Sequence, residues 1–274
     1  MIQRTGLLLV CLALVGFCAS CMLAVYDYPG VEAPIERFQR SGALLSGATL
    51  ELRNFDGNIE IQGWGNERVE VYAEKLILLP PRTRVSLWTS DWGKWAPKIE
   101  YEMLEDSVRI NTKSRNREGT DTVVDYFVSV PHSVNLKDIV ARDGDMIIRD
   151  VYGQALVDLR AGNLTVDNFS GSLTAVVAEG TIRATLVDLR EVDQIRLTAQ
   201  RGDIILYLER SVSARFEGSA PKGGVFTEFE SVAPEEKEGR VSARFGSGEG
   251  AIISATALEG DIRVRTIGEV KEKR

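Results

Sequence analysis

Aspartates placed beside glycines are the residues whose types and spacing could do chemistry in this sequence. Asp143 and Asp145 flank Gly144, and Asp203 directly follows Gly202. Paired carboxylates can serve as acid and base in the hydrolysis of polysaccharides, or as ligands of calcium. Other aspartates close to expected turns are Asp158, Asp167, Asp188 and Asp193.

The position of Asp145 within its repeat argues against catalysis. The equivalent positions of later repeats hold Asn163, Thr181 and Asp203. Such a mixture is typical of side chains that bond to a turn backbone, and an active site would need fixed carboxylates. We therefore assign no catalytic residue and expect a protein that is not an enzyme, with a polysaccharide-active enzyme as the alternative.

Other kinds of catalytic or metal site lack the residues that they need. His132 is the only histidine and no G-x-S-x-G motif occurs, so a Ser-His-Asp triad is not expected. The three cysteines all lie within the first 21 residues, which leaves the rest of the sequence without a thiol for zinc. We expect no metal and no cofactor. The formal net charge of −7 also argues against a nucleic-acid partner.

The N-terminal segment predicts a membrane anchor. Arg4 precedes an apolar run from Gly6 to Phe17, and the small residues Ala19 and Ser20 precede Cys21. This order is typical of a secretory signal and is similar to a bacterial lipobox, although Cys18 replaces the usual Leu or Val. We expect a lipoprotein signal peptide over 1–20 and lipid attachment at Cys21. An uncleaved anchor or a plain signal peptide are the alternatives. The expected location is the cell envelope, on the outer membrane in a Gram-negative organism, with the membrane as one partner.

A regular repeat runs through the centre of the sequence. Glycines recur every nine residues, at Gly144, Gly153, Gly162, Gly171 and Gly180. Aligned at 18 residues, or 22 at the last step, the sequence shows two apolar columns. They are Met146, Leu164, Ile182, Ile204 and, two residues on, Ile148, Val166, Ala184, Leu206. A spacing of two places both columns on one face of a strand.

These columns predict an all-β fold, a single-stranded β-solenoid of short strands with turns of 18–22 residues. Each repeat would hold two strands and two glycine corners, and neighbouring repeats would cover one another's apolar faces. Regularly spaced hairpins of an antiparallel sandwich are the alternative. Fainter copies begin at Gly57 and Gly260, and VSARFEGS (212–219) is nearly repeated by VSARFGSG (241–248). We expect the solenoid over 48–268, a tether over 21–47 and a charged tail over 269–274.

One segment, 76–122, lacks the glycine repeat and is expected to be an irregular insertion or a cap with flanking strands. It holds Trp88, Trp92 and Trp95. These rings could form an exposed patch that binds a glycan, a peptide or lipid head groups, or they could cover the open end of the stack.

The repeats G-D-M-I-I (144–148) and G-D-I-I-L (202–206), with LELRNFDGNIEIQGW (50–64 and the residue before them), carry a family resemblance. The sequence resembles the bacterial "putative adhesin" domain family of unknown function, over most of residues 48–266. The resemblance implies a β-solenoid and an envelope location, and its motifs are structural. We expect a non-catalytic binding or structural module with a cell-wall, protein or peptide ligand. A partner of an envelope-stress sensing system is a further alternative.

Overall fold

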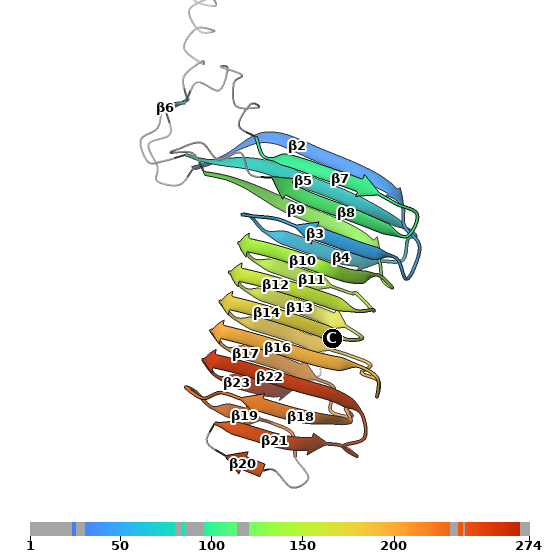
Figure 1. The fold of residues 1–274 in the computed structure, drawn as a ribbon, viewed down its shortest axis with the longest axis vertical. Helices are drawn as coiled ribbons and strands as arrows, with labels where there is room; N and C mark the ends of the chain where they lie inside the picture. The colour runs from blue at the N-terminus through green and yellow to red at the C-terminus, as the bar shows by residue number, and fades with distance from the viewer. Residues whose placement is uncertain are drawn as a thin grey trace, which may run out of the picture.

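The computed structural model describes residues 24–25, 31–79, 84–85, 96–113, 121–230, 235–237 and 239–268. Every regular element in these residues is a β-strand. Two large sheets face each other and run the length of an elongated stack, with the N-terminal strands at one end (Figure 1). The predicted all-β solenoid is therefore confirmed.

One wall of the stack is an 11-stranded sheet that includes alternate strands of the repeats. Its strands, in spatial order, are β20 (Glu235–Lys237), β21 (Arg240–Phe245), β18 (Ala214–Ser219), β22 (Ala251–Glu259), β16 (Gln194–Arg201), β14 (Leu173–Glu179), β12 (Ala155–Ala161), β10 (Asn135–Asp143), β3 (Thr49–Arg53), β8 (Ser107–Lys113) and β7 (Lys98–Met103).

The opposite wall is a 10-stranded sheet that takes the other strand of each repeat. In the same spatial direction its strands are β19 (Val225–Thr227), β23 (Ile262–Thr266), β17 (Ile204–Leu208), β15 (Ile182–Leu186), β13 (Leu164–Phe169), β11 (Met146–Arg149), β4 (Ile59–Trp64), β9 (Asp121–Pro131), β5 (Arg68–Leu79) and β2 (Val31–Ala43). A separate pair is formed by β1 (Ala24–Val25) and β6 (Arg84–Val85).

The core consists of the columns that the sequence predicts. Met146 pairs with Leu164, Leu164 with Ile182, and Ile182 with Ile204, all in parallel register. All four side chains are fully buried, and so is the second column from Ile148 to Leu206. Burying one such side chain contributes about 1.5–3 kcal/mol, so the stacked columns stabilise the coil along its whole length. The parallel register excludes the antiparallel sandwich for these strands.

The turns from the 11-stranded to the 10-stranded sheet form one edge of the stack, which we call the first corner. It holds Gly57, Gly144, Gly162, Gly180, Gly202 and Gly260, all with positive φ. Gly162 has φ 129°, and a Cβ added there would lie 2.1 Å from the carbonyl oxygen of Gly144. Glycine is required because its neighbouring turn stacks directly against its Cα.

Side chains next to these glycines bind the turns to one another. The Oδ1 atom of Asn58 accepts a hydrogen bond from the Asp145 amide at 2.9 Å, and Asp145 Oδ1 accepts one from the Asn163 amide at 2.8 Å. Asn163 Oδ1 in turn accepts from the Thr181 amide at 3.1 Å. Asp203 repeats the contact with the Asp261 amide at 2.9 Å. We call this series the first-corner ladder; it confirms that the column of Asp145 does turn chemistry.

At the N-terminal end, the chain departs from the predicted boundaries. The tether expected over 21–47 is wrong for residues 31–43, which form β2 and pair antiparallel with β5. Hydrophobic alternation could not reveal this strand. It lies at the edge of its sheet, and of its described side chains only Phe38 is partly buried against the core.

The predicted insertion at 76–122 supplies an internal layer of the stack as well as a cap. Strand β8 pairs in parallel with β3, and β9 pairs in parallel with β4, so β8 and β9 form a regular layer outside β3 and β4. Strand β7 then pairs antiparallel with β8, and β5 pairs antiparallel with β9. These strands confirm the flanking strands expected after residue 98.

At the C-terminal end, the two near-copies of VSARF do not stack as parallel repeats. They form β18 and β21, which pair antiparallel. Strand β22 lies between β16 and β18, so the chain passes over one position and fills it later. Phe245 stacks on Phe216 with ring centroids 5.6 Å apart and contacts Phe229 at 4.8 Å, and these rings close the core.

No helix in the described residues is long and apolar enough to cross a membrane.

Candidate binding groove

The site residues chosen for their local sequence context lie outside the described residues. These are Cys21 and the tryptophans Trp88, Trp92 and Trp95, and the charged tail 269–274 lies outside them as well. Lipid attachment and the aromatic patch therefore stay predictions. The fourth tryptophan, Trp64, is partly buried and donates its indole N–H to the Arg68 carbonyl at 2.9 Å.

The aspartates that could have formed an acidic site are spread over different surfaces. Asp143 and Asp145 lie at the first corner, where Asp145 also accepts a bond from the Asn163 side chain at 3.2 Å. Asp158 and Asp167 are exposed on strands of opposite sheets, whereas Asp188 and Asp193 lie in one loop on the other edge of the stack. Among the described residues, no group of three or more His, Cys, Asp or Glu is placed to hold a metal ion.

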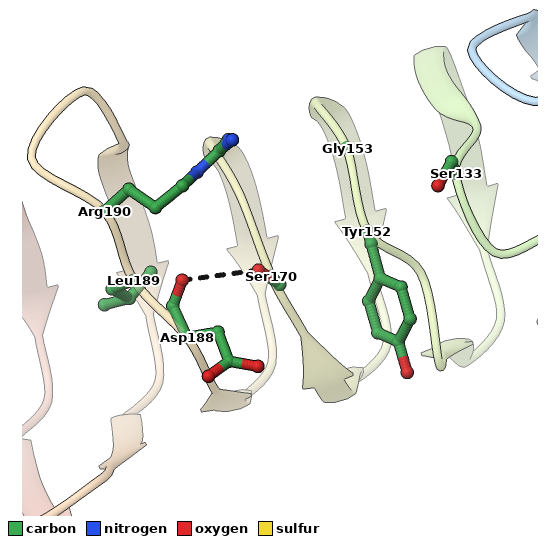
Figure 2. A pocket seen from close by; sticks show the side chains of 7 residues that line it. All are labelled: Ser133, Tyr152, Gly153, Ser170, Asp188, Leu189 and Arg190. Atoms are coloured by element: carbon green, nitrogen blue, oxygen red, sulfur yellow. Dashed lines mark hydrogen bonds between the residues drawn. The ribbon is translucent and has the colours of Figure 1, made fainter.

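The edge opposite the first corner holds the turns that return from the 10-stranded to the 11-stranded sheet, and we call it the second corner. Three of its turns are short: 132–134, 150–154 and 170–172. The next turn, 187–193, is longer and accounts for the 22-residue step of the repeat. The short turns form the floor of a groove and the long turn forms a wall at one end (Figure 2).

The groove has a volume of about 570 Å³ and crosses four successive turns. Figure 2 shows its lining side by side, from the long turn across to the turn of Ser133. The lining residues are Ser133, Tyr152, Gly153, Ser170, Asp188, Leu189 and Arg190.

The wall is held in shape by a buried carboxylate. Asp193 is 2% exposed and accepts hydrogen bonds from the Arg190 amide at 2.8 Å and from the Arg190 guanidinium at 3.1 Å. The bond to Asp193 raises the pKa of the Arg190 guanidinium, which therefore keeps its charge. A buried carboxylate stays ionised only with such partners, so the pair fixes both the turn and the base of the Arg190 side chain.

The floor is held by a network around Tyr152. Its ring, 39% exposed, stacks on His132 with centroids 5.2 Å apart and an interplanar angle of 14°. His132 Nδ1 lies 2.8 Å from the Asp150 carbonyl oxygen, which explains the single histidine as a turn residue. Hydrogen bonds from the Asn168 and Gln62 side chains lower the pKa of the Asp150 carboxyl, so this group stays ionised near neutral pH.

The backbone of the floor is already paired. The Tyr152 amide donates to the His132 carbonyl at 2.7 Å, and the Gly153 amide donates to the Ser170 carbonyl at 2.9 Å. The Ser170 amide donates to the Val151 carbonyl at 3.2 Å. A ligand can therefore use these side chains, but it cannot add itself as a further strand to this surface.

A second hollow continues the same corner towards the C-terminal end. It has a volume of about 590 Å³ and is lined by Val187, Glu209, Arg210, Ser211, Ile267 and Gly268. Between the two hollows, Glu209 Oε2 accepts a hydrogen bond from the Asp188 amide at 3.0 Å. The second corner is thus hollowed along at least five turns, whereas the first corner is filled by its ladder.

Sequence reasoning did not find this groove. Its signal was present in the sequence as the change of the repeat from 18 to 22 residues, which places Asp188–Asp193 where a short glycine turn would otherwise stand. Tyr152 was hidden for a different reason. Its exposure depends on which side of a turn its ring leaves, and this is fixed by stacking on His132 from another turn.

Comparison with known proteins gives the following similarities. A family model described as Toastrack DUF4097 matches residues 46–265. A crystal structure of a "putative cell adhesion protein" from Clostridium sporogenes is 12% identical, with a TM-score of 0.51, and covers 85% of this chain and 100% of that chain. A "putative adhesin" from Bacteroides fragilis is also 12% identical, covers 85% and 97%, and has a TM-score of 0.38, which is too low to support an argument. A search of curated proteins finds no match. At these identities the likeness supports the fold alone.

Proposed function

Because the chain belongs to the Toastrack DUF4097 family, we propose that it is a non-catalytic, adhesin-like binding module of the bacterial cell envelope. The description of the similar Clostridium sporogenes structure as a "putative cell adhesion protein" supports this proposal. The N-terminal segment around Cys21 supports the envelope location, with the lipid on Cys21 as the anchor.

The observation that carries the proposal is the difference between the two corners. At the first corner, Asp145 and Asp203 are used as acceptors that join neighbouring turns. At the second corner, the turns differ from one another and leave an open polar groove. A site that binds needs an accessible surface of mixed chemistry, which only the second corner offers among the described turns.

Binding would require little rearrangement of the protein. Each layer of the stack is hydrogen-bonded to its neighbours on both sides, and the groove wall is fixed by the contact between Arg190 and Asp193. A preformed surface loses little conformational entropy on binding, so weak polar contacts can give useful affinity. The mechanism is rigid display, with no covalent step.

The anchoring part of the proposal is tested by the Cys21→Ala variant. The full chain is expressed in a bacterial host, and membrane retention and electrophoretic mobility are compared with those of the wild type. We expect the variant to be lost from the detergent-soluble membrane fraction. Unchanged retention together with unchanged mobility would contradict lipid attachment.

The binding part is tested with the full-length protein in detergent micelles and sedimented envelope fragments. We expect cosedimentation with the fragments and no release of soluble sugar. Release of sugar that is abolished by Asp145→Asn would contradict the proposal and support the polysaccharide-active enzyme. Absence of cosedimentation would contradict the binding function itself.

The tryptophan segment is a separate proposal. We expect Trp88, Trp92 and Trp95 to cover an end of the stack, with an exposed binding patch as the competing arrangement. The test is the fluorescence of the full chain with acrylamide as quencher. Blue-shifted emission that resists quenching would favour the cap, and red-shifted, readily quenched emission would favour the patch.

A further inference from the structure

We infer that the second-corner groove binds a neutral glycan chain that lies along the axis of the stack. This inference rests on the proposed binding function and names the class of ligand for the groove. It is carried by the chemistry of the lining, by its charge, and by the spacing of the turns that form it.

The lining combines one aromatic face with several short polar groups. Tyr152 is 39% exposed beside the backbone of Gly153, and Ser133 and Ser170 present hydroxyls from the turns on either side. Hydroxyls both donate and accept hydrogen bonds, and so do the hydroxyls of a sugar. The apolar face of a sugar ring suits the face of an aromatic side chain, because both pair an apolar surface with polar edges.

The charges of the lining favour a neutral ligand. Asp188 and Arg190 are its ionisable side chains apart from the phenol of Tyr152, and they have opposite signs. The positive charge of Arg190 is already compensated by the carboxylate of Asp193. A strongly anionic chain would need a cluster of uncompensated cations, which this lining does not provide. Sugar hydroxyls can instead bond to the carboxylate of Asp188 and to the free N–H groups of Arg190.

The spacing of the turns argues against an extended peptide. Equivalent groups in successive turns are one strand spacing apart, which is about 4.8 Å. An extended peptide presents side chains on one face about every 6.8 Å, so it falls out of step with the turns within two layers. The paired backbone amides of Tyr152, Gly153 and Ser170 also exclude strand addition here. A pyranose ring is comparable in length to one layer, so a chain of sugars can place one ring over each turn.

The lining also lacks the apolar pocket that protein partners use as an anchor. Its one aliphatic side chain is Leu189, which is partly buried against the core of the stack. Interfaces between proteins derive most of their affinity from large side chains inserted into desolvated pockets. An open, polar groove crossed by one aromatic ring fits a linear glycan better.

The test uses the full-length protein in detergent micelles and isothermal titration with neutral hexasaccharides of glucose, mannose, galactose and N-acetylglucosamine. An oligomer of galacturonic acid serves as the anionic probe, and a serine- and threonine-rich decapeptide serves as the peptide probe. Two variants disable the groove in different ways. Tyr152→Ala removes the aromatic face, whereas Ser133→Trp fills the groove and leaves Tyr152 in place. Thermal melting by circular dichroism checks that each variant is folded.

The matched control is Tyr72→Ala. Tyr72 lies in β5 and is 37% exposed, close to the exposure of Tyr152, but it lies on the 10-stranded sheet, away from the groove. We expect at least one neutral hexasaccharide to bind, about tenfold or more weaker binding in both groove variants, and no change in Tyr72→Ala.

Each other result has a defined meaning. The inference is overturned if none of the neutral hexasaccharides binds, if both groove variants bind as the wild type does, or if the anionic or peptide probe binds better. If envelope fragments still cosediment in any of those cases, the glycan inference fails and the proposed binding function stands. If cosedimentation is absent as well, both fail.

Discussion

The two corners of the stack are formed by the same layers, yet they differ in almost every physical respect. At the first corner, six turns carry a glycine with positive φ, and most of them are joined through an Asn or Asp side chain. At the second corner, successive turns differ in length and composition, and their lining ranges from Ser133 to Arg190.

This difference shows where the fold is determined and where a function can be located. The first corner has no room for change, because each glycine is in contact with the carbonyl of the previous turn. The second corner tolerates a turn as long as 187–193 without disturbing the strands on either side, since β14 and β16 remain in parallel register. Surface variation can therefore accumulate at the second corner, where a binding groove is found.

The largest expected effect comes from breaking the first corner with Gly162→Ala. The new Cβ would lie 2.1 Å from the Gly144 carbonyl oxygen, and φ at this position is 129°. Alanine can relieve neither problem without moving two turns, so we expect a loss of about 3–5 kcal/mol in the free energy of unfolding. Chemical denaturation followed by circular dichroism measures this loss.

The matched control for that substitution is Gly65→Ala. Gly65 lies between β4 and β5 at the second-corner edge, and a Cβ there meets no atom within 4 Å. We expect a change within about 0.5 kcal/mol. Equal losses for Gly162→Ala and Gly65→Ala would contradict the difference between the corners.

A smaller effect is expected from removing one contact of the first-corner ladder. Asn163→Ala leaves the Thr181 amide without its 3.1 Å partner and should destabilise the protein by about 1 kcal/mol. Asp188→Asn, at the second corner, should change stability by less than about 0.5 kcal/mol, because asparagine also tolerates the φ of 47° found there. Thermal melting of both variants tests the pair, and a larger loss for Asp188→Asn would contradict the account.

The smallest expected effect concerns pH. The hydrogen bond from the Asp261 amide, followed by that from Arg263, lowers the pKa of the Asp203 carboxyl below its ordinary 3.8. The stability contributed by the ionised carboxylate is present above that value and is lost as the pH falls through the lowered pKa. We therefore expect the stability difference between wild type and Asp203→Asn to shrink from pH 7 to pH 3.

The pH prediction needs a control that lies outside the ladder. Asp158→Asn, on an exposed position of β12, serves this purpose. Urea unfolding at several pH values measures all three proteins. A difference between wild type and Asp203→Asn that is unchanged down to pH 3 would contradict the role assigned to the carboxylate.

The regular middle of the stack could be predicted from the sequence, and its ends could not. From β10 to β17, period-two burial and a fixed repeat length are local properties, so Leu164 and Ile182 identify their own column. At the ends, layers are added out of chain order, as β8 and β9 are outside β3 and β4. This order depends on which exposed edge is covered by which distant strand, and no local pattern records it.

The candidate site was even less accessible to prediction. The predicted role of the Asp145 column as turn chemistry is confirmed, and the groove beside Tyr152 was missed. The first is a repeated contact with the next layer, so that it appears as a column in the alignment of repeats. The second is formed by the one turn that breaks the repeat together with a ring held by His132, and neither feature repeats.

The most direct test of the account is hydrogen exchange measured by mass spectrometry on the full-length protein, with and without bound envelope fragments. We predict slower exchange in the second-corner turns 150–154, 168–172 and 187–193, and unchanged exchange in the first-corner turns around Gly144, Gly162 and Gly180. Slower exchange at the first corner, with none at the second, would contradict the claim that the second corner is the binding surface.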